Sequence, residues 1–242
     1  MNLSGERRPQ SYLRETLWSD APVSYIVVTP PVPSFPLNPD KADWSVWDFP
    51  DVVDHWNFPG YEWKKMTVSV YSNCEQVELF LNGESLGKQE NTADKKNTLV
   101  WEVPYAHGIL KAVSYNKGGE VGTATLESAG KVEKIRLSAD RTEIVADGND
   151  LSYITLELVD SKGIRNQLAE ELVEFSIEGD ATIEGVGNAN PMSIESFVAN
   201  SRKTWRGSNL LVVRSGKSSG RIIVTAKVKA LPVASITITQ KK

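Results

Sequence analysis

The chain has 242 residues, 40% hydrophobic and 24% charged, which is enough for one or two globular domains with a buried core. Its 27 Lys and Arg against 31 Asp and Glu give a formal charge of −4, with both signs scattered along the chain. This pattern predicts no nucleic-acid interface, and no run of 18 apolar residues is present to predict a membrane span.

The single cysteine, Cys74, cannot form a disulfide within the chain. It sits in an apolar alternation, which predicts a buried small hydrophobe rather than a reactive thiol. The polar residues after Met1 do not form a secretory signal, so the sequence leaves the compartment of this chain unknown.

A short helix is predicted over residues 4 to 18, because Pro9 suits a first helical turn and Tyr12, Leu13 and Leu17 recur at helical spacing. We assign residues 1–22 to this element. Residues 23–65 form an entry segment, in which an extended stretch leads into closely spaced prolines and then into an aromatic-rich stretch.

Strands dominate residues 66–129. The predicted strands are Met66–Tyr71, Val77–Leu81, Glu84–Lys88, Leu99–Val103, Ile109–Asn116 and Val121–Glu127. Asn82-Gly83 predicts a type I′ hairpin turn, because both residues tolerate a positive φ. Short strands at this spacing, with no helical period between them, indicate an antiparallel sandwich.

Small residues at 128–131 mark a boundary, and residues 130–242 are predicted to form a second sandwich of similar size. Its candidate strands are Val132–Ala139, Tyr153–Asp160, Val173–Glu178, Leu210–Arg214, Arg221–Lys229 and Ala234–Thr239. The glycine-rich stretch 179–191 does not open a helix, so it predicts no phosphate loop. The predicted fold class is all-β, with two tandem immunoglobulin-like antiparallel β-sandwiches after a short helix.

Candidate binding residues gather in the aromatic stretch from Trp44 to Trp63. They are Trp44, Trp47, His55, Trp56, Phe58 and Trp63. Aromatic rings can stack on sugars, and a histidine can donate to a sugar hydroxyl, but the same residues can pack a sandwich edge or an interface. Both interpretations stay open, with packing favoured, and we expect part of this aromatic surface to be exposed.

Polar clusters give weaker signals. Asp48, Asp51 and Asp54 do not have the ligand spacing of a calcium loop, and Asp147-Gly148-Asn149-Asp150 is typical of a turn, so no metal site is predicted. Two histidines and no nucleophile signature predict no catalytic triad and no cofactor. A further cluster fits either a glycan contact or the closing loops of a sandwich: Asn188, Asn190, Glu195, Arg202 and Trp205.

Four stretches together resemble the C-terminal region of family 2 glycoside hydrolases of the β-galactosidase-like type. GERRPQSYLRETLW resembles the last helix of their catalytic (β/α)8 barrel, and DHWNFPG with VSVYSNCEQVELFLNGESLGK resembles the sandwich that follows it. ADRTEIVADGNDLSYITLELVDSKG and IEGVGNANPMSIESFVANSRKTWRGSNLLVVRS are similar to the terminal bacterial-immunoglobulin-like domain. The resemblance covers nearly the whole chain in the family's order.

The resemblance implies that residues 1–22 are a remnant of the last barrel helix. The two catalytic carboxylates of the family lie on barrel strands upstream of that helix, so no catalytic residue is expected here. We therefore expect a fragment of a longer, secreted or periplasmic bacterial enzyme that hydrolyses β-glycosides with retention. The missing barrel is the expected partner, against which Tyr12, Leu13, Leu17 and Trp18 would pack in the longer enzyme. In this chain by itself we expect the helix end to be poorly packed or to lie against the aromatic stretch.

Three functions compete at this stage. The first is a non-catalytic C-terminal part that braces the barrel, and the second is a carbohydrate-binding module that uses the aromatic stretch. The third, an autonomous glycosidase, is disfavoured because the family's carboxylates lie upstream. The glycoside and its linkage depend on loops of the barrel, which this sequence does not contain.

Overall fold

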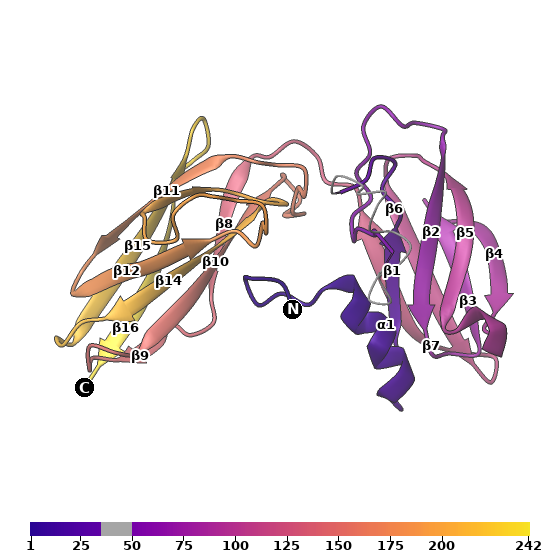
Figure 1. Ribbon diagram of the computed structural model, residues 1–242, viewed down its shortest axis with the longest axis horizontal. Coiled ribbons are helices and arrows are strands. Elements are labelled where there is room, and N and C mark those ends of the chain that lie inside the picture. Colours follow the sequence, from indigo (N-terminus) through magenta and orange to yellow (C-terminus); the bar gives the residue numbers. More distant parts are fainter. Residues whose placement is uncertain (35–49) are drawn as a thin grey trace. The chain divides into compact units, whose positions relative to one another are not determined.

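The computed structural model describes residues 1–34 and 50–242 and divides them into two compact units (Figure 1). The first sandwich is Arg7–Ser128, and the second sandwich is Ala129–Lys242 together with Met1–Glu6. Each unit contains two β-sheets around its own apolar core. The prediction of an all-β chain with two sandwiches and one short helix is confirmed.

The first sandwich pairs a three-stranded sheet, in the order β1-β2-β5, with a four-stranded sheet, in the order β4-β3-β6-β7. Its elements are α1 (Pro9–Trp18), β1 (Ser24–Val28), β2 (Lys65–Ser72), β3 (Gln76–Leu81), β4 (Glu84–Glu90), the 3₁₀ helix η2 (Ala93–Lys95), β5 (Thr98–Pro104), β6 (Ile109–Asn116) and β7 (Gly119–Glu127). All strand pairs in these two sheets are antiparallel.

Sequence chemistry explains the β3–β4 hairpin. Leu81 pairs with Glu84, and the two turn residues between them, Asn82 and Gly83, have φ values of 52° and 87°. These values are those of a type I′ turn, whose twist matches that of the flanking strands. The predicted hairpin is therefore confirmed.

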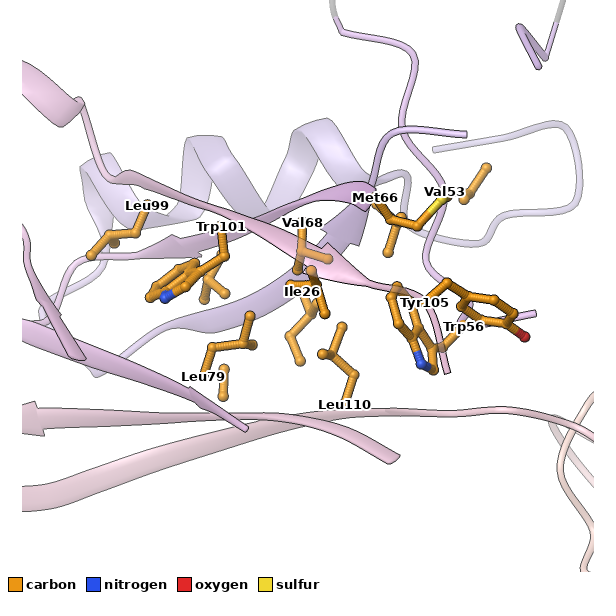
Figure 2. Close-up of a cluster of buried hydrophobic side chains, with 14 of the residues drawn as sticks. Ile26, Val53, Trp56, Met66, Val68, Leu79, Leu99, Trp101, Tyr105 and Leu110 are labelled. Atoms are coloured by element: carbon orange, nitrogen blue, oxygen red, sulfur yellow. The ribbon is translucent and has the colours of Figure 1, made fainter. Parts of the chain in front are cut away.

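Trp56 is the largest fully buried side chain in the core of the first sandwich (Figure 2). Its ring is fully buried and meets Phe58 and Tyr105 edge-on, with centroid distances of 6.0 and 5.0 Å. The indole N–H donates to the carbonyl of Ala106 at 2.8 Å, so the buried polar atom is satisfied. The entry segment is thus anchored in the core by its own tryptophan.

Helix α1 packs on the outer face of the three-stranded sheet. In β1, Ile26 faces the core between the sheets while Val27 faces the opposite side, where Tyr12 and Leu13 of α1 cover it. Tyr12 stacks on Tyr25 with ring centroids 3.7 Å apart. In this chain Tyr12 and Leu13 are partly buried without a barrel, because the outer face of this sheet is apolar enough to hold them.

The C-terminal end of α1 is largely uncovered by the described residues of its unit. Leu17 is 65% exposed and Trp18 is 84% exposed. Leu17 lies one helical turn after Leu13 on the same side of the helix, and Trp18 is the last helical residue, but neither side chain is covered by the sheet that holds Tyr12 and Leu13. The helix therefore presents an apolar tip to solvent, defined here as Leu17 and Trp18.

The second sandwich pairs a four-stranded sheet, β12-β14-β10-β8, with a five-stranded sheet, β13-β11-β15-β16-β9. Its strands are β8 (Lys134–Ala139), β9 (Glu143–Val145), β10 (Leu151–Val159), β11 (Leu172–Glu178), β12 (Ala181–Gly187), β13 (Ser201–Lys203), β14 (Ser208–Ser215), β15 (Gly220–Val228) and β16 (Ala234–Lys241). A purely antiparallel sandwich was expected, but β9 pairs in parallel with β16. The stretch 179–191 contains β12, a strand the glycine-rich sequence did not predict.

Asp160 ties the start of the second sandwich to the turn after β10. Its side chain is buried and accepts hydrogen bonds from the backbone N–H groups of Gly130, at 2.8 Å, and Ile164, at 2.9 Å. Burial acts to raise the pKa of this carboxyl, but backbone N–H donors, from Lys162 and Gly163 as well, outweigh burial and lower the pKa below its ordinary value of 3.8. The anionic form is thus preferred in the folded state.

Replacing Trp56 with Ala should lower the free energy of unfolding of the first sandwich by about 3–5 kcal/mol, because the buried ring leaves a cavity. Urea unfolding followed by fluorescence measures this loss. Trp63→Gly is the matched control: Trp63 is 81% exposed, and its removal should cost less than about 1 kcal/mol. Equal losses for the two variants would contradict the anchoring role of Trp56.

Asp160→Asn should lower the free energy of unfolding of the second sandwich by about 1–3 kcal/mol at neutral pH, because it weakens charge-assisted hydrogen bonds. A lowered folded-state pKa gives stability that is present above the ordinary pKa of 3.8 and lost as pH falls through the folded value. The variant should therefore show a smaller loss between neutral pH and about pH 2 than the native chain. Exposed Asp20→Asn is the control, and an unchanged acid dependence in Asp160→Asn would refute the assignment.

Candidate functional site

The aromatic stretch divides into buried and exposed residues. Trp44 and Trp47 lie outside the described residues. Trp56 is fully buried and Phe58 is 6% exposed, so neither ring offers a free face to a ligand in this fold. Among the described residues of the stretch, only Trp63 is a large aromatic side chain exposed to solvent.

Trp63 lies in a tight turn that is held at both ends. Its backbone N–H donates to the carbonyl of Tyr105 at 2.8 Å, and the Tyr105 N–H donates to the carbonyl of Lys64 at 2.9 Å. The φ of Trp63 is 67°, a left-handed conformation that is strained for a bulky residue. The Nζ of Lys64 lies 4.7 Å from the centre of the Tyr61 ring. The turn thus fixes the backbone of Trp63 and leaves its indole exposed.

His55 and its neighbouring aspartates take part in local hydrogen bonds. The Nδ1 of His55 accepts the backbone N–H of Asn57 at 3.2 Å, and the ring lies 4.9 Å from that of Phe58. Asp54 accepts the hydroxyl of Tyr25 at 2.8 Å, and Asp51 accepts the backbone N–H of Ser34 at 2.6 Å. These contacts shape the entry segment. Asp48 lies outside the described residues.

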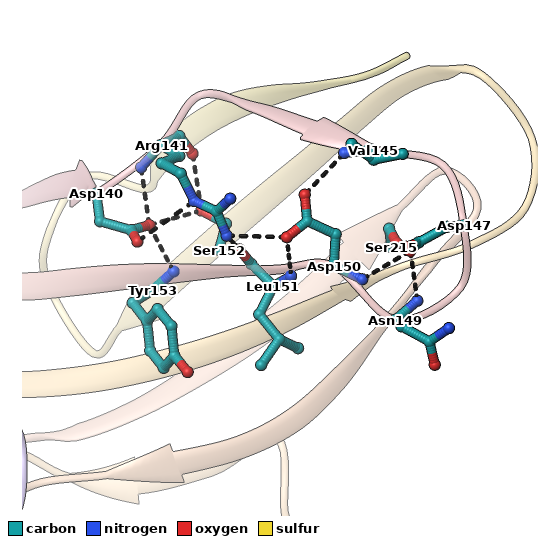
Figure 3. A network of polar contacts seen from close by, with 10 residues as sticks. All are labelled: Asp140, Arg141, Val145, Asp147, Asn149, Asp150, Leu151, Ser152, Tyr153 and Ser215. Carbon is teal, nitrogen blue, oxygen red and sulfur yellow. Dashed lines mark hydrogen bonds and ion pairs between the residues drawn. The ribbon is translucent and has the colours of Figure 1, made fainter. Parts of the chain in front are cut away.

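The turn predicted at 147–150 is part of a wider polar network (Figure 3). Oδ1 of Asp147 accepts the N–H groups of Asn149 and Asp150, at 2.7 and 2.8 Å, and Asp150 accepts the N–H of Val145 at 2.8 Å. Arg141 forms an ion pair with Asp150 at 3.0 Å. The network connects β8, β9 and β10.

Backbone N–H donors lower the pKa of both Asp147 and Asp150. The acid catalyst of a retaining glycosidase needs a raised pKa and lies about 5–5.5 Å from a nucleophilic carboxylate. Two carboxyls that are both held as anions by the backbone do not meet this requirement. This pair therefore serves the fold.

A shallow hollow of about 620 Å³ lies on the outer face of the second sandwich. Its lining comes from β8, β10 and β14 and from the N-terminal segment: Leu3, Ser4, Gly5, Ser138, Ala139, Asp140, Tyr153, Thr155 and Leu210. Asp140, the one carboxylate in this lining, accepts the N–H groups of Arg141 and Tyr153, at 2.7 and 2.8 Å. The hollow has no second carboxylate for paired acid–base chemistry.

The cluster predicted around Arg202 is brought together in the connection between β12 and β13, residues 188–200, which we call the arginine loop. Asn188 is buried and donates to the carbonyl of Lys203 at 2.9 Å. Arg202 is buried beneath the loop, and Glu195 lies 4.0 Å from its Nε. Trp205 stands apart from the loop, beside Arg206.

Sequence reasoning missed the apolar residues of the arginine loop, which are Met192, Ile194, Phe197 and Val198. All four are exposed. Four apolar residues within seven, without the alternation of a strand, were the available signal.

Within residues 1–34 and 50–242, no group of three or more His, Cys, Asp or Glu side chains is placed to hold a metal ion. The same ranges contain no helix that is long and apolar enough to cross a membrane. Cys74 is buried and unpaired, as its place in the sequence predicted.

Two family models match this chain. Residues 135–237 match "Glycoside hydrolase family 2 C-terminal domain 5", and residues 64–122 match a domain of unknown function designated DUF4982. The first match lies within the second sandwich and the second within the first sandwich.

Among curated proteins, the chain is 32% identical over 203 residues to β-galactosidase BoGH2A of Bacteroides ovatus, which covers 84% of this chain and 24% of that protein. It is 30% identical over 205 residues to a β-glucuronidase of Formosa agariphila, covering 82% of this chain and 20% of that protein. The chain thus spans about a quarter or less of the length of these relatives.

Two solved structures are similar over nearly the whole chain. A glycosyl hydrolase family 2 member from Bacteroides cellulosilyticus is 98% identical with a TM-score of 0.99, and the match covers all of this chain and 31% of that one. A β-glycosidase from Bacteroides vulgatus is 24% identical with a TM-score of 0.83, and the match covers 99% of this chain and 27% of the β-glycosidase chain. The second of these supports the fold alone.

Proposed function

The chain belongs to the C-terminal region of the family 2 glycoside hydrolases, and from this premise we propose that it is a non-catalytic brace for the catalytic barrel of a longer enzyme. The observation that carries the proposal is the match of residues 135–237 to a C-terminal domain of that family. The share of each relative that the chain spans, between 20% and 31%, supports it.

We infer that the longer enzyme hydrolyses β-glycosides with retention, using two carboxylates that lie upstream of these residues. The relatives include proteins named β-galactosidase and β-glucuronidase, which share the β-glycoside class. The BoGH2A match, over 84% of this chain, favours a β-galactosidase-type enzyme. The anionic Asp147 and Asp150 support a role outside the chemical step.

The barrel contact is proposed at the apolar tip of α1. Leu17 and Trp18 are 65% and 84% exposed, although large apolar side chains gain about 1.5–3 kcal/mol each on full burial. The side of α1 that carries Tyr12 already packs on the first sandwich. A helix that packs on the sandwich through Tyr12 and Leu13, and carries exposed apolar residues at its C-terminal end, can join the sandwich to a second body.

The 242-residue chain alone should not hydrolyse a chromogenic β-galactoside or β-glucuronide above the rate in buffer, because the proposed carboxylates lie elsewhere. The longer B. cellulosilyticus relative, assayed in parallel on both substrates, is the reference. Turnover by the purified 242-residue chain would overturn the proposal.

A double variant, Leu17→Asp with Trp18→Ser, tests the brace. In the 242-residue chain its melting temperature should change by no more than about 2 °C, because both residues are exposed. In a longer polypeptide that contains the barrel, the same change should lower the melting temperature by roughly 5–10 °C, because a charge enters an apolar contact. Exposed Asp20→Ala is the neighbouring control. Equal behaviour in the two contexts would refute the contact.

A carbohydrate-binding function is the second candidate, and the exposed, strained indole of Trp63 favours it. Trp63→Gly is the informative variant, because glycine adopts the positive φ freely and the fold should be kept. On polysaccharide gels, this candidate predicts that the native chain is retarded and that Trp63→Gly migrates as it does without polysaccharide. Unretarded migration of the native chain on every glycan would exclude it.

A further inference from the structure

The arginine loop exposes apolar side chains, whereas surface loops usually expose polar ones. Met192 is 68% exposed, Ile194 is 101% exposed, Phe197 is 53% exposed and Val198 is 83% exposed. Single exposed apolar side chains are common on protein surfaces, but a cluster of them marks an interaction site.

The polar side chains of the same loop are used internally. Asn188 accepts the N–H of Asn190 at 3.1 Å, and Asn190 accepts the N–H of Met192 at 2.9 Å. Glu195 accepts the N–H of Lys203 at 3.1 Å and the hydroxyl of Ser193 at 3.0 Å. The polar side chains of the loop thus form hydrogen bonds with the loop itself and with β13, and its apolar side chains point to solvent.

Arg202 holds this shape from beneath. Its Nη1 donates to the carbonyls of Val186 and Glu195, at 3.2 and 3.1 Å, and its Nη2 donates to the hydroxyl of Ser193 at 3.1 Å. The guanidinium lies 4.3 Å from the centre of the Phe197 ring. A buried charge is costly unless it is satisfied, so these contacts favour one loop conformation. A surface held rigid before binding loses less entropy on docking.

The N-terminal segment indicates what covers the loop. A Cβ atom at Gly187 would lie 3.9 Å from Cε1 of Phe197 and 4.0 Å from Oγ of Ser4, so the segment passes beside the Phe197 ring. Glu6 fixes the segment to the second sandwich through an ion pair with Arg165 at 2.8 Å. The matched family model is a C-terminal domain, so the remainder of a longer relative precedes the matched region. In such a polypeptide, the preceding chain arrives beside the loop.

We propose that the arginine loop is an intramolecular docking surface, with Ile194 and Val198 at its centre, for the preceding part of the same polypeptide. The fitting partner surface is mainly apolar, because the loop presents methyl, thioether and aromatic groups while Arg202 is buried and the half-buried Glu195 is hydrogen-bonded within the loop. This inference rests on the proposed function, since it requires a longer enzyme, but it involves a different surface from the α1 tip.

Hydrogen–deuterium exchange tests the docking directly. The peptide that contains residues 192–198 should exchange at least about tenfold more slowly in the longer B. cellulosilyticus relative than in the 242-residue chain, because docking removes it from water. Peptides from β15 should exchange equally in both. Equal exchange of the loop peptide in the two proteins would overturn the proposal.

The double variant Ile194→Asp with Val198→Asp provides the second test. In the 242-residue chain it should melt as the native chain does, since both side chains are exposed. In the longer protein it should lower the melting temperature by several degrees and remove the protection of the loop, whereas Val233→Asp, at a 57%-exposed control position, should do neither. If the 242-residue chain is instead dimeric and the double variant makes it monomeric, the partner is a second copy and the proposal is wrong.

These results separate the two proposals. If the Leu17→Asp, Trp18→Ser variant does not lower the melting temperature of the longer protein while the loop stays protected from exchange, the brace contact at α1 is rejected and the loop interface is kept. An unprotected loop with a destabilising α1 variant would do the opposite.

Discussion

Burial of Trp56 is the constraint on which the first sandwich depends. Its ring is fully enclosed between Phe58 and Tyr105, and its N–H reaches the carbonyl of Ala106. In the described part of the entry segment that follows β1, the isolated bridge between Val28 and Val53 joins the chain to a sheet, and Trp56 adds a buried anchor in the core. Once it is anchored, the turn that follows can present Trp63 at a fixed place on the surface.

The second sandwich uses buried polar groups in the same way. Asp160 collects backbone N–H donors at the start of the unit, and Arg202 collects carbonyls beneath the arginine loop. Each charge is almost fully removed from water and hydrogen-bonds to backbone groups of the opposite polarity, although the Nε of Arg202 has no hydrogen-bond partner among the described residues. Irregular backbone between strands is thereby hydrogen-bonded to side chains of its own unit.

Both units leave apolar groups exposed where their own cores are already complete. In the first sandwich these are Leu17 and Trp18 at the end of α1, and in the second they are the outer side chains of the arginine loop. Neither set is needed to close a core. The proposed role in a longer glycoside hydrolase gives both surfaces a use, since each would be buried against another part of the same polypeptide.

The local elements and the family resemblance could be predicted from neighbouring residues and motifs alone. Alternation in Met66–Tyr71, the Asn82-Gly83 turn and Pro9 in a first helical turn depend on neighbouring residues alone, and all three were predicted correctly. Only the tertiary structure decided which aromatic residue is core and which is surface. Trp56 and Trp63 have similar surroundings in the sequence, but the partners that bury Trp56 lie some fifty residues away, at Tyr105 and Ala106. The parallel pairing of β9 with β16 and the glycine-rich strand β12 also depend on partners distant in the chain, and local pattern does not encode such contacts.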